Sequence, residues 1–214
     1  MPHRIGVAVR SLDQYGAMFE AFPPSRREEL AALAARYGTP LVRIAELSGR
    51  PFDPIRRADR RIGEVCFVVR RPDGTLLTGI KSFYPPTAYR LLTGGIDDGE
   101  PIHDALLREL REETGLTVIV RRFLAAIAYR RDGAHVFSTF AFLVDEAGGD
   151  LASADSHEQL AAFGAVDPSD LARMATTLEQ LPDGFDARLG GSWRDWGRFR
   201  AVVHRAVAEA LADQ

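Results

Sequence analysis

The sequence predicts an α/β fold in which helices flank a mixed β-sheet, with further helical segments near both ends of the chain. Strand-like runs come first in the central part, one helix follows, and more strand-like runs come after it. Strands and a helix in this order fit a mixed sheet with helices packed on its faces. The length of 214 residues allows one large domain or one domain with additions.

The first strand-like runs are residues 62–71 (IGEVCFVVRR) and 75–80 (TLLTGI). Pro72-Asp73-Gly74 separates them, and these are residue types that favour a tight turn. Two apolar runs around such a turn predict a pair of adjacent strands.

The central helix is predicted between Pro101 and Gly115. Proline suits the first helical turn, and glycine suits the left-handed conformation that ends a helix. The residues between them are mostly good helix formers. Residues 117–129 and 136–144 then predict two further strands, separated by the turn-forming residues 131–133.

A helical projection of this segment places two carboxylates at the margin of an apolar stripe. Ile102, Leu106 and Leu110 form the stripe, and Glu109 and Glu113 lie beside it, one turn apart. Two buried carboxylates repel each other and lose hydration, at a cost of several kcal/mol per ion unless something compensates. A divalent cation would compensate, and hard carboxylate oxygens suit Mg²⁺ or Mn²⁺.

The other charged residues of the helix point away from that stripe. Glu112 lies on its flank, and Arg108, Arg111 and Asp104 are predicted to face water. Taken alone, these charged residues also fit an ordinary solvent-exposed helix surface, stabilised by ion pairs between residues four apart, such as Arg108 with Glu112.

The helix belongs to a longer pattern over residues 94–116, GGIDDGEPIHDALLRELREETGL. The pattern is G-x5-E-x7-R-E-U-x-E-E-x-G-U, where U is a bulky aliphatic residue, and every fixed position is filled. This stretch, called the box below, resembles the signature of the Nudix hydrolases. The resemblance implies a loop–helix–loop on an α/β/α sandwich and the hydrolysis of a nucleoside diphosphate linked to another group, X.

The resemblance also implies a metal site. Glu109 and Glu113 would be the main ligands, and Glu112 a third or a water-mediated one. The main-chain carbonyl of Thr93 would add a ligand, and Arg108 would orient the glutamates.

Substrate-binding and catalytic residues follow from the same resemblance. Gly94 and Gly95 would let the backbone approach the pyrophosphate, as glycine permits. Arg90 is among several arginines that could contact phosphate. Glu109 is one candidate for the general base, and Glu158 on a downstream loop is another.

Composition limits the partners. The net charge of −3 gives no strong field toward nucleic acid or a membrane, so neither is expected as a partner. The resemblance implies a small nucleotide-type substrate instead. No run of about 18 apolar residues and no signal peptide is visible, so a cytoplasmic location is expected. Cys66 is the single cysteine, which excludes an intrachain disulfide.

We divide the chain into a partly helical N-terminal extension, residues 1–60, and a Nudix-like domain, residues 61–214, that includes a C-terminal helix. The extension, with a helix expected over residues 25–37, would pack on the core, pair two subunits or cover a substrate site. Apolar residues after Gly191 recur at helical spacing, which favours packing in the core or in a homodimer over base stacking. They are Trp196, Phe199, Val203, Ala206 and Val207.

The predicted function is Mg²⁺-dependent hydrolysis of a pyrophosphate bond. The sequence leaves X open among nucleotide sugars, dinucleotides and nucleoside triphosphates. One alternative is a catalytically weak Nudix module that senses a nucleotide, and another is an isomerase of isoprenyl diphosphates. Relatives with those roles tend to depart from the box, which is intact here, so hydrolysis is favoured.

Overall fold

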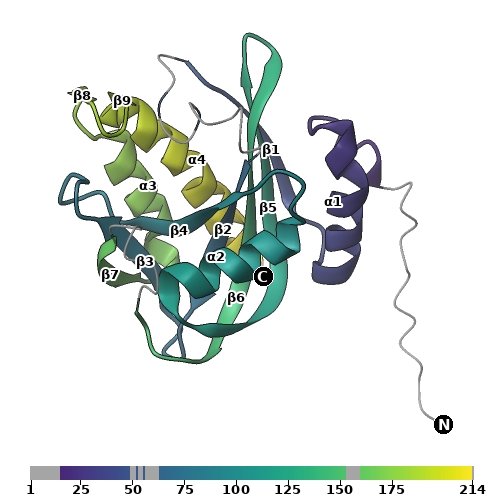
Figure 1. Ribbon diagram of the computed structural model, residues 1–214, viewed down its shortest axis with the longest axis horizontal. Helices are drawn as coiled ribbons and strands as arrows, with labels where there is room; N and C mark the ends of the chain where they lie inside the picture. The colour runs from purple at the N-terminus through teal and green to yellow at the C-terminus, as the bar shows by residue number, and fades with distance from the viewer. Residues whose placement is uncertain (1–14, 49–51, 53–54, 56–62, 153–159, 214) are drawn as a thin grey trace.

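The computed structural model describes residues 15–48, 52, 55, 63–152 and 160–213. They form an α/β/α sandwich around a seven-stranded sheet of order β1-β5-β6-β2-β4-β3-β7 (Figure 1). The strands are β1 (Leu41–Glu46), β2 (Gly63–Arg70), β3 (Leu76–Lys81), β4 (Arg90–Ile96), β5 (Thr117–Arg131), β6 (Ala134–Gly148) and β7 (Leu160–Val166).

The sheet is mixed, as the sequence predicts. β1 runs parallel to β5, and β2 runs parallel to β6, while the other neighbouring strands are antiparallel. The long β5–β6 hairpin turns at Asp132 and Gly133, which adopt φ values of 51° and 76°. These positive values explain the Asp-Gly sequence, since both residue types tolerate the left-handed region better than most.

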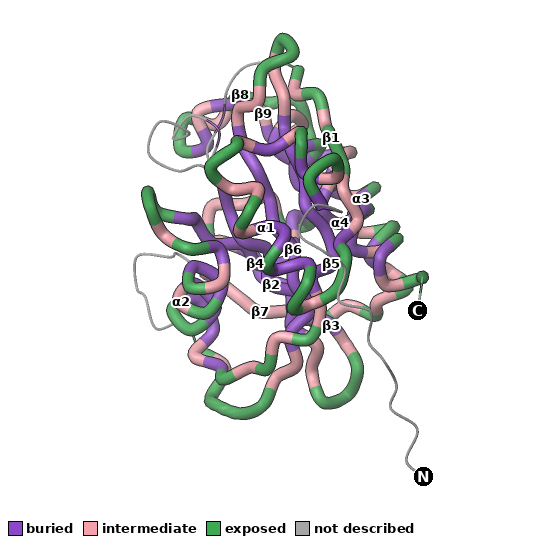
Figure 2. Tube along the Cα trace, turned by 90° about the vertical axis from the view of Figure 1, so that its right-hand side faces the viewer, coloured by how far each residue is buried: buried purple, intermediate pink, exposed green. Residues whose placement is uncertain are grey.

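Helices cover both faces of the sheet. The side chains of β2 alternate between two apolar clusters, as the period of a strand requires. Val65 and Phe67 pack in the cluster of α1 (Pro24–Tyr37) and α2 (Ile102–Thr114). Cys66 and Val68 pack in the cluster of α3 (Leu171–Glu179) and α4 (Trp193–Ala212). Figure 2 shows the central strands buried between these layers.

Several elements were not predicted: β1, β4, β7, α3 and the short hairpin of β8 (Phe185–Asp186) and β9 (Gly191–Ser192). β1 is the most consequential, because it extends the central sheet from a segment assigned to the N-terminal extension. Its residues Leu41–Glu46 pair with 125–130 of β5. The described part of the extension therefore shares the sheet and core of the rest of the chain.

Helix α1 also caps the helix of the box. Pro101 precedes α2 and provides no side-chain cap. Instead the Ile102 N–H donates to Glu29 of α1 at 2.5 Å. Arg26 donates to the same carboxylate at 2.7 Å and to the carbonyl of Glu100 at 2.9 Å. A side chain distant in sequence thus satisfies an N–H group that a helix start leaves without an intrahelical partner.

Candidate active site

A cavity of about 120 Å³ lies where the box meets the sheet and α4. Its walls come from β2, the end of β3, β4, α2, β6, the turn after β8 and α4. Six residues predicted for the site line it together: Arg90, Thr93, Gly94, Gly95, Glu109 and Glu113.

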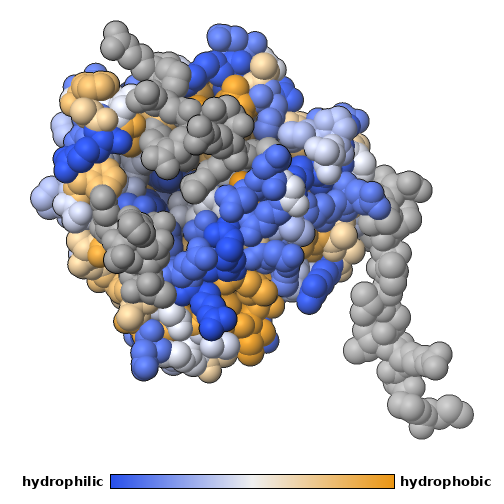
Figure 3. Space-filling view, in the orientation of Figure 1, coloured by the Kyte–Doolittle hydropathy of each residue, from blue (hydrophilic) through white to orange (hydrophobic). Residues whose placement is uncertain are grey.

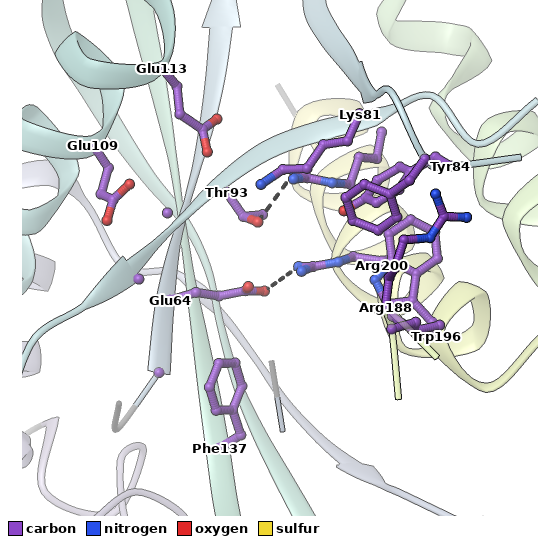
Figure 4. Close-up of a pocket in the computed structure, with 16 residues that line it drawn as sticks. Glu64, Lys81, Tyr84, Thr93, Glu109, Glu113, Phe137, Arg188, Trp196 and Arg200 are labelled. Carbon is purple, nitrogen blue, oxygen red and sulfur yellow. Dashed lines mark hydrogen bonds and ion pairs between the residues drawn. The ribbon is translucent and has the colours of Figure 1, made fainter. Parts of the chain in front are cut away.

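Two carboxylates of α2 face this cavity (Figure 4). Glu109 and Glu113 are buried, with 7% and 3% of their surface exposed, so their predicted core-side placement is confirmed. Glu112 is exposed and does not line the cavity. The outer surface of α2, where Asp104 and Arg111 are also exposed, is mainly hydrophilic (Figure 3).

Arg108 was predicted to face water, and this was wrong. Its side chain is only 31% exposed and folds back over the box. The guanidinium donates to both carboxylate oxygens of Glu100 at 2.7 Å, to Glu109 at 2.9 Å and to Glu112 at 3.1 Å. A further bond reaches the carbonyl of Gly95 at 3.0 Å. A helical projection gives only the direction in which a side chain leaves the helix. It does not show that the long arginine side chain can bend back to contact the loop before α2.

These bonds join the loop of the box to its helix. Glu100 also accepts the Asp97 N–H at 3.0 Å, which fixes the turn before α2. The hydrogen bonds from Arg108 hold the pKa of the Glu100 carboxyl below its usual value. Glu100 is therefore a structural counterion within the box and does not line the cavity.

Glycine is required where β4 passes α2. A Cβ atom at Gly94 would lie 2.3 Å from the Cβ of Glu109, closer than side-chain atoms approach. In the sheet, Gly94 is paired with Val65, and Gly95 with Glu64. Gly63 is similarly confined, because a Cβ there would lie 2.6 Å from the Ser138 carbonyl oxygen. The floor between Glu109 and Glu64 is therefore bare backbone.

Arg90 and Thr93 lie on β4 beside that floor, and both are buried. The Arg90 guanidinium donates to the Leu91 carbonyl at 2.8 Å and to the Thr93 hydroxyl at 3.3 Å. It also lies 5.9 Å from the centre of the Tyr84 ring.

A buried histidine fixes β4 to α4. The Leu91 N–H donates to His204 Nε2 at 3.0 Å, so this nitrogen carries no proton. Nδ1 therefore donates to the Arg200 carbonyl at 2.7 Å. Burial lowers the pKa of His204 to about 4, which keeps the ring neutral.

Sequence analysis missed the far side of the cavity, formed by Glu64, Arg188, Trp196 and Arg200. Glu64 and Arg200 are 136 residues apart in sequence and form an ion pair of 2.6 Å, with side chains 5% and 6% exposed. The Thr139 hydroxyl donates to the same Glu64 oxygen at 2.9 Å. One signal was available: Glu64 is a charged residue that directly precedes the apolar run Val65–Val69 of its strand.

Glu158, the second candidate for the general base, lies outside the described residues. Within the described ranges, no three acidic, histidine or cysteine side chains group closely enough to form a metal centre by themselves. Glu109 and Glu113 nevertheless supply hard oxygen ligands beside exposed backbone. This fits Mg²⁺, which usually keeps several waters and binds one or two carboxylates together with substrate phosphates.

Comparison with known proteins gives a family match over most of the chain. The NUDIX domain matches residues 59–189. The human NAD-capped RNA hydrolase NUDT12 is 44% identical over 55 residues, which is 25% of this chain and 12% of that protein. NUDT12 of Pongo abelii matches equally. The aligned segment is therefore a small part of these relatives.

The similarity to solved structures is weaker. An ADP-ribose pyrophosphatase from Streptococcus suis has a TM-score of 0.41 and 16% identity, covering 70% of this chain and 90% of its own. A Caenorhabditis elegans Ap4A hydrolase has a TM-score of 0.42 and 21% identity, covering 66% of this chain and 98% of its own.

Proposed function

This chain belongs to the Nudix hydrolase family, and from that premise we propose that it hydrolyses the pyrophosphate bond of a nucleoside diphosphate linked to another group, with Mg²⁺ or Mn²⁺ as cofactor. One observation carries the proposal: two buried carboxylates of α2, Glu109 and Glu113, share a cavity with the bare backbone of Gly94 and Gly95. Acidic ligands beside open backbone suit a cation that bridges to phosphate oxygens.

The cation would be held by Glu109 and Glu113, with the Thr93 carbonyl as a further ligand and Glu112 acting through water. When bound, a divalent cation neutralises charge on the phosphates and lowers the pKa of a bound water. Burial of the two glutamates supports their part in this set, since a cation would offset the cost of placing both carboxylates there.

The remaining residues position the reactants. Arg108 holds Glu109 through its 2.9 Å hydrogen bond and ties it to the carbonyl of Gly95. The backbone of Gly94 and Gly95 would lie against the pyrophosphate, and Arg90 would contribute positive charge at the same floor. Catalysis of this kind depends mostly on positioning and on electrostatic stabilisation.

A carboxylate must also accept the proton of the attacking water. Glu109 faces the cavity and can do so. Glu158 is the alternative, from the stretch outside the described residues. The pH dependence of turnover in Glu158→Gln would separate the two, because loss of the acidic limb in this variant would identify Glu158 as the base and its retention would favour Glu109.

Glu113→Gln tests the metal site. We expect at least a 100-fold lower rate of phosphoanhydride hydrolysis, the scale seen when one preorganised electrostatic group is lost. The far-ultraviolet circular dichroism spectrum should stay unchanged. Asp104→Asn is the matched control, because Asp104 is exposed on the same helix and does not line the cavity. Unchanged turnover in Glu113→Gln would contradict the proposed site.

The group X is addressed by a screen of nucleotide sugars, dinucleotides and nucleoside triphosphates, each with Mg²⁺ and with EDTA. One matched relative, NUDT12, is a hydrolase of NAD-capped RNA, so dinucleotides belong in the screen. Metal-dependent release of products from one class supports hydrolysis. Tight binding without turnover of any class would instead favour a nucleotide sensor.

A cytoplasmic location and a homodimer complete the proposal. No helix within the described ranges is long and apolar enough to cross a membrane. Light scattering on the purified chain would determine its oligomeric state.

A further inference from the structure

The wall of the cavity opposite α2 carries three arginines: Arg90 from β4, Arg188 from the turn after β8, and Arg200 from α4. They are called the arginine wall below. Figure 4 shows Arg188 and Arg200 across the cavity from Glu109 and Glu113. Arg200 lies beyond the residues that match the family, which end at 189.

Arg200 is buried with its hydrogen-bonding capacity only partly used. One terminal nitrogen donates to Glu64. Its Nε atom is buried and has no hydrogen-bond acceptor among the described residues. A buried donor left without a partner costs about 1–3 kcal/mol, so the ion pair with Glu64 holds this guanidinium at the cavity at some cost.

Arg90 is in a similar position. It is 3% exposed, and its hydrogen bonds reach only a carbonyl and a hydroxyl, which are neutral groups. Its Nε also has no acceptor within the described part of the chain. Burial opposes its charge, but Tyr84 and the nearby carboxylates of Glu113 and Glu64 outweigh this effect and keep the pKa of Arg90 above its usual value.

Aromatic rings hold the three guanidinium groups in place. Arg90 lies 5.9 Å from the ring centre of Tyr84, Arg188 lies 5.2 Å from that of Phe83, and Arg200 lies 5.7 Å from that of Trp196. Cation–π contacts restrain a guanidinium and leave its N–H groups available for an anion.

The charges of this wall are unbalanced. Glu64 is the one carboxylate that lines the cavity there, and it is bonded to Arg200. Arg188 has its own partner, Asp186, at 3.0 Å, and its side chain is 62% exposed. The cavity as a whole is lined by four cationic side chains, the three arginines and Lys81, and by three carboxylates, Glu64, Glu109 and Glu113. A divalent cation at Glu109 and Glu113 would leave an excess of positive charge, which favours a polyanionic ligand.

We propose that the arginine wall is a subsite for a phosphate group of the substrate beyond the scissile diphosphate. The inference rests on the proposed function, which places the scissile diphosphate at Glu109 and Glu113. It selects among the open substrate classes: a nucleoside triphosphate, or another substrate with a third phosphate, is preferred over a nucleotide joined to an uncharged sugar. Arginine suits this role because its planar fork matches phosphate oxygens.

The test compares two non-hydrolysable probes that differ by one phosphate, α,β-methylene-ATP and α,β-methylene-ADP. Binding is measured by titration calorimetry in the presence of Mg²⁺, which the proposed function requires to seat the diphosphate beside Glu109 and Glu113. We expect the full chain to bind the triphosphate analogue at least tenfold more tightly. In Arg188→Ala, and in the paired variant Glu64→Gln/Arg200→Gln, this preference should fall to less than threefold.

The variants are chosen so that misfolding does not hide the answer. Arg188 is exposed, so its loss should leave the fold intact, and the paired variant avoids leaving Glu64 as an uncompensated buried charge. Arg194→Ala is the control, because Arg194 lies on α4 and pairs with Asp183 outside the cavity. It should keep the full preference.

Equal binding of the two probes to the unmodified chain would overturn the subsite, as would a preference that survives both variants. The proposed hydrolysis stands or falls separately, in the metal-dependent screen with Mg²⁺. A chain that prefers the triphosphate analogue but hydrolyses nothing would retain the subsite and lose the hydrolase assignment.

Discussion

At Gly94 the backbone of β4 lies against the first atoms of the Glu109 side chain, with no room for a methyl group. Gly94→Ala should therefore push α2 away from β4. We expect a loss of about 1–3 kcal/mol in stability, typical of overpacking, and more than a tenfold loss in kcat/KM as Glu109 shifts. Chemical denaturation and initial-rate kinetics measure the two effects.

Gly184→Ala is the control for that substitution, because nothing lies within 4 Å of the position of its Cβ. It should change neither stability nor rate. If Gly94→Ala kept full activity, the close approach of strand and helix would have no part in placing Glu109.

His204 makes stability depend on pH. Its pKa is lowered by burial from 6.5 to about 4 in the folded chain. Between these values the unfolded chain binds the proton and the folded chain does not, so stability falls as pH falls from about 6.5 to about 4. Over this range the free energy of unfolding falls by about 3 kcal/mol, because each unit of pKa shift corresponds to about 1.36 kcal/mol. Above pH 6.5 this contribution is constant.

Urea unfolding across pH 4–7 would measure this dependence against His204→Gln, which cannot titrate. The variant should be less stable at pH 7 and should show a flatter pH profile. Identical slopes for the two chains would show that another group controls the acid sensitivity.

The positions of Glu109 and Glu113 were predictable from the sequence, whereas the opposite wall of the cavity was not. Glu109 and Glu113 stand at a fixed spacing on one helix, so a local pattern places them. Glu64 and Arg200 meet only because α4 packs across the sheet from β2, and no spacing in the sequence encodes that contact. Trp196 was predicted to pack in the core; it does so and also lines the cavity.

At the scale of elements, α1 stabilises α2 through Glu29. Glu29→Ala removes the acceptor for the Ile102 N–H and should cost about 1 kcal/mol, as the loss of a helix cap does. Glu29→Gln keeps an acceptor oxygen and should recover most of the loss. Glu28→Ala, at an exposed neighbouring position, is the control. Thermal unfolding provides the measurement.

If Glu29→Ala and Glu28→Ala were equally stable, the contact between α1 and α2 would add nothing to the helix. A selective loss would also lower activity, since α2 carries Glu109 and Glu113.

Strong local signals decided which elements could be predicted. The helix of the box has glycine at its end, and Gly115 adopts φ 69° there as expected. The β2 and β3 strands flank a Pro-Asp-Gly turn. In contrast, β4 (RLLTGGI) and β7 (LAAFGAV) contain glycine and alanine, which are poor strand formers. Their pairing with distant strands, rather than their own propensity, makes them strands.

At the scale of the whole molecule, residues 15–48 complete the sandwich. β1 covers the edge of β5, and Leu30 of α1 is fully buried in the cluster that also contains Leu106. A chain that begins at residue 59, where the family match starts, would expose both the strand edge and this apolar face. Exposed edges and apolar faces promote association.

We therefore expect the chain from residue 59 to aggregate or to unfold without cooperativity. Size-exclusion chromatography and urea titration would detect this. A chain from residue 15 keeps every contact described above and should behave as the full chain does. A monomeric, cooperatively folded chain from residue 59 would show that the N-terminal segment is dispensable.

The two walls of the cavity belong to opposite layers of the sandwich, α2 on one and α4 on the other. Among the described residues the sheet lies between the two apolar clusters, so we expect side chains on α4 to be exchangeable without disturbing the packing of α2. For protein engineering this separates two tasks. A library varied at Trp196, at Arg200 together with Glu64, and at the turn of Arg188 would sample new substrate preferences while Glu109 and Glu113 stay in place.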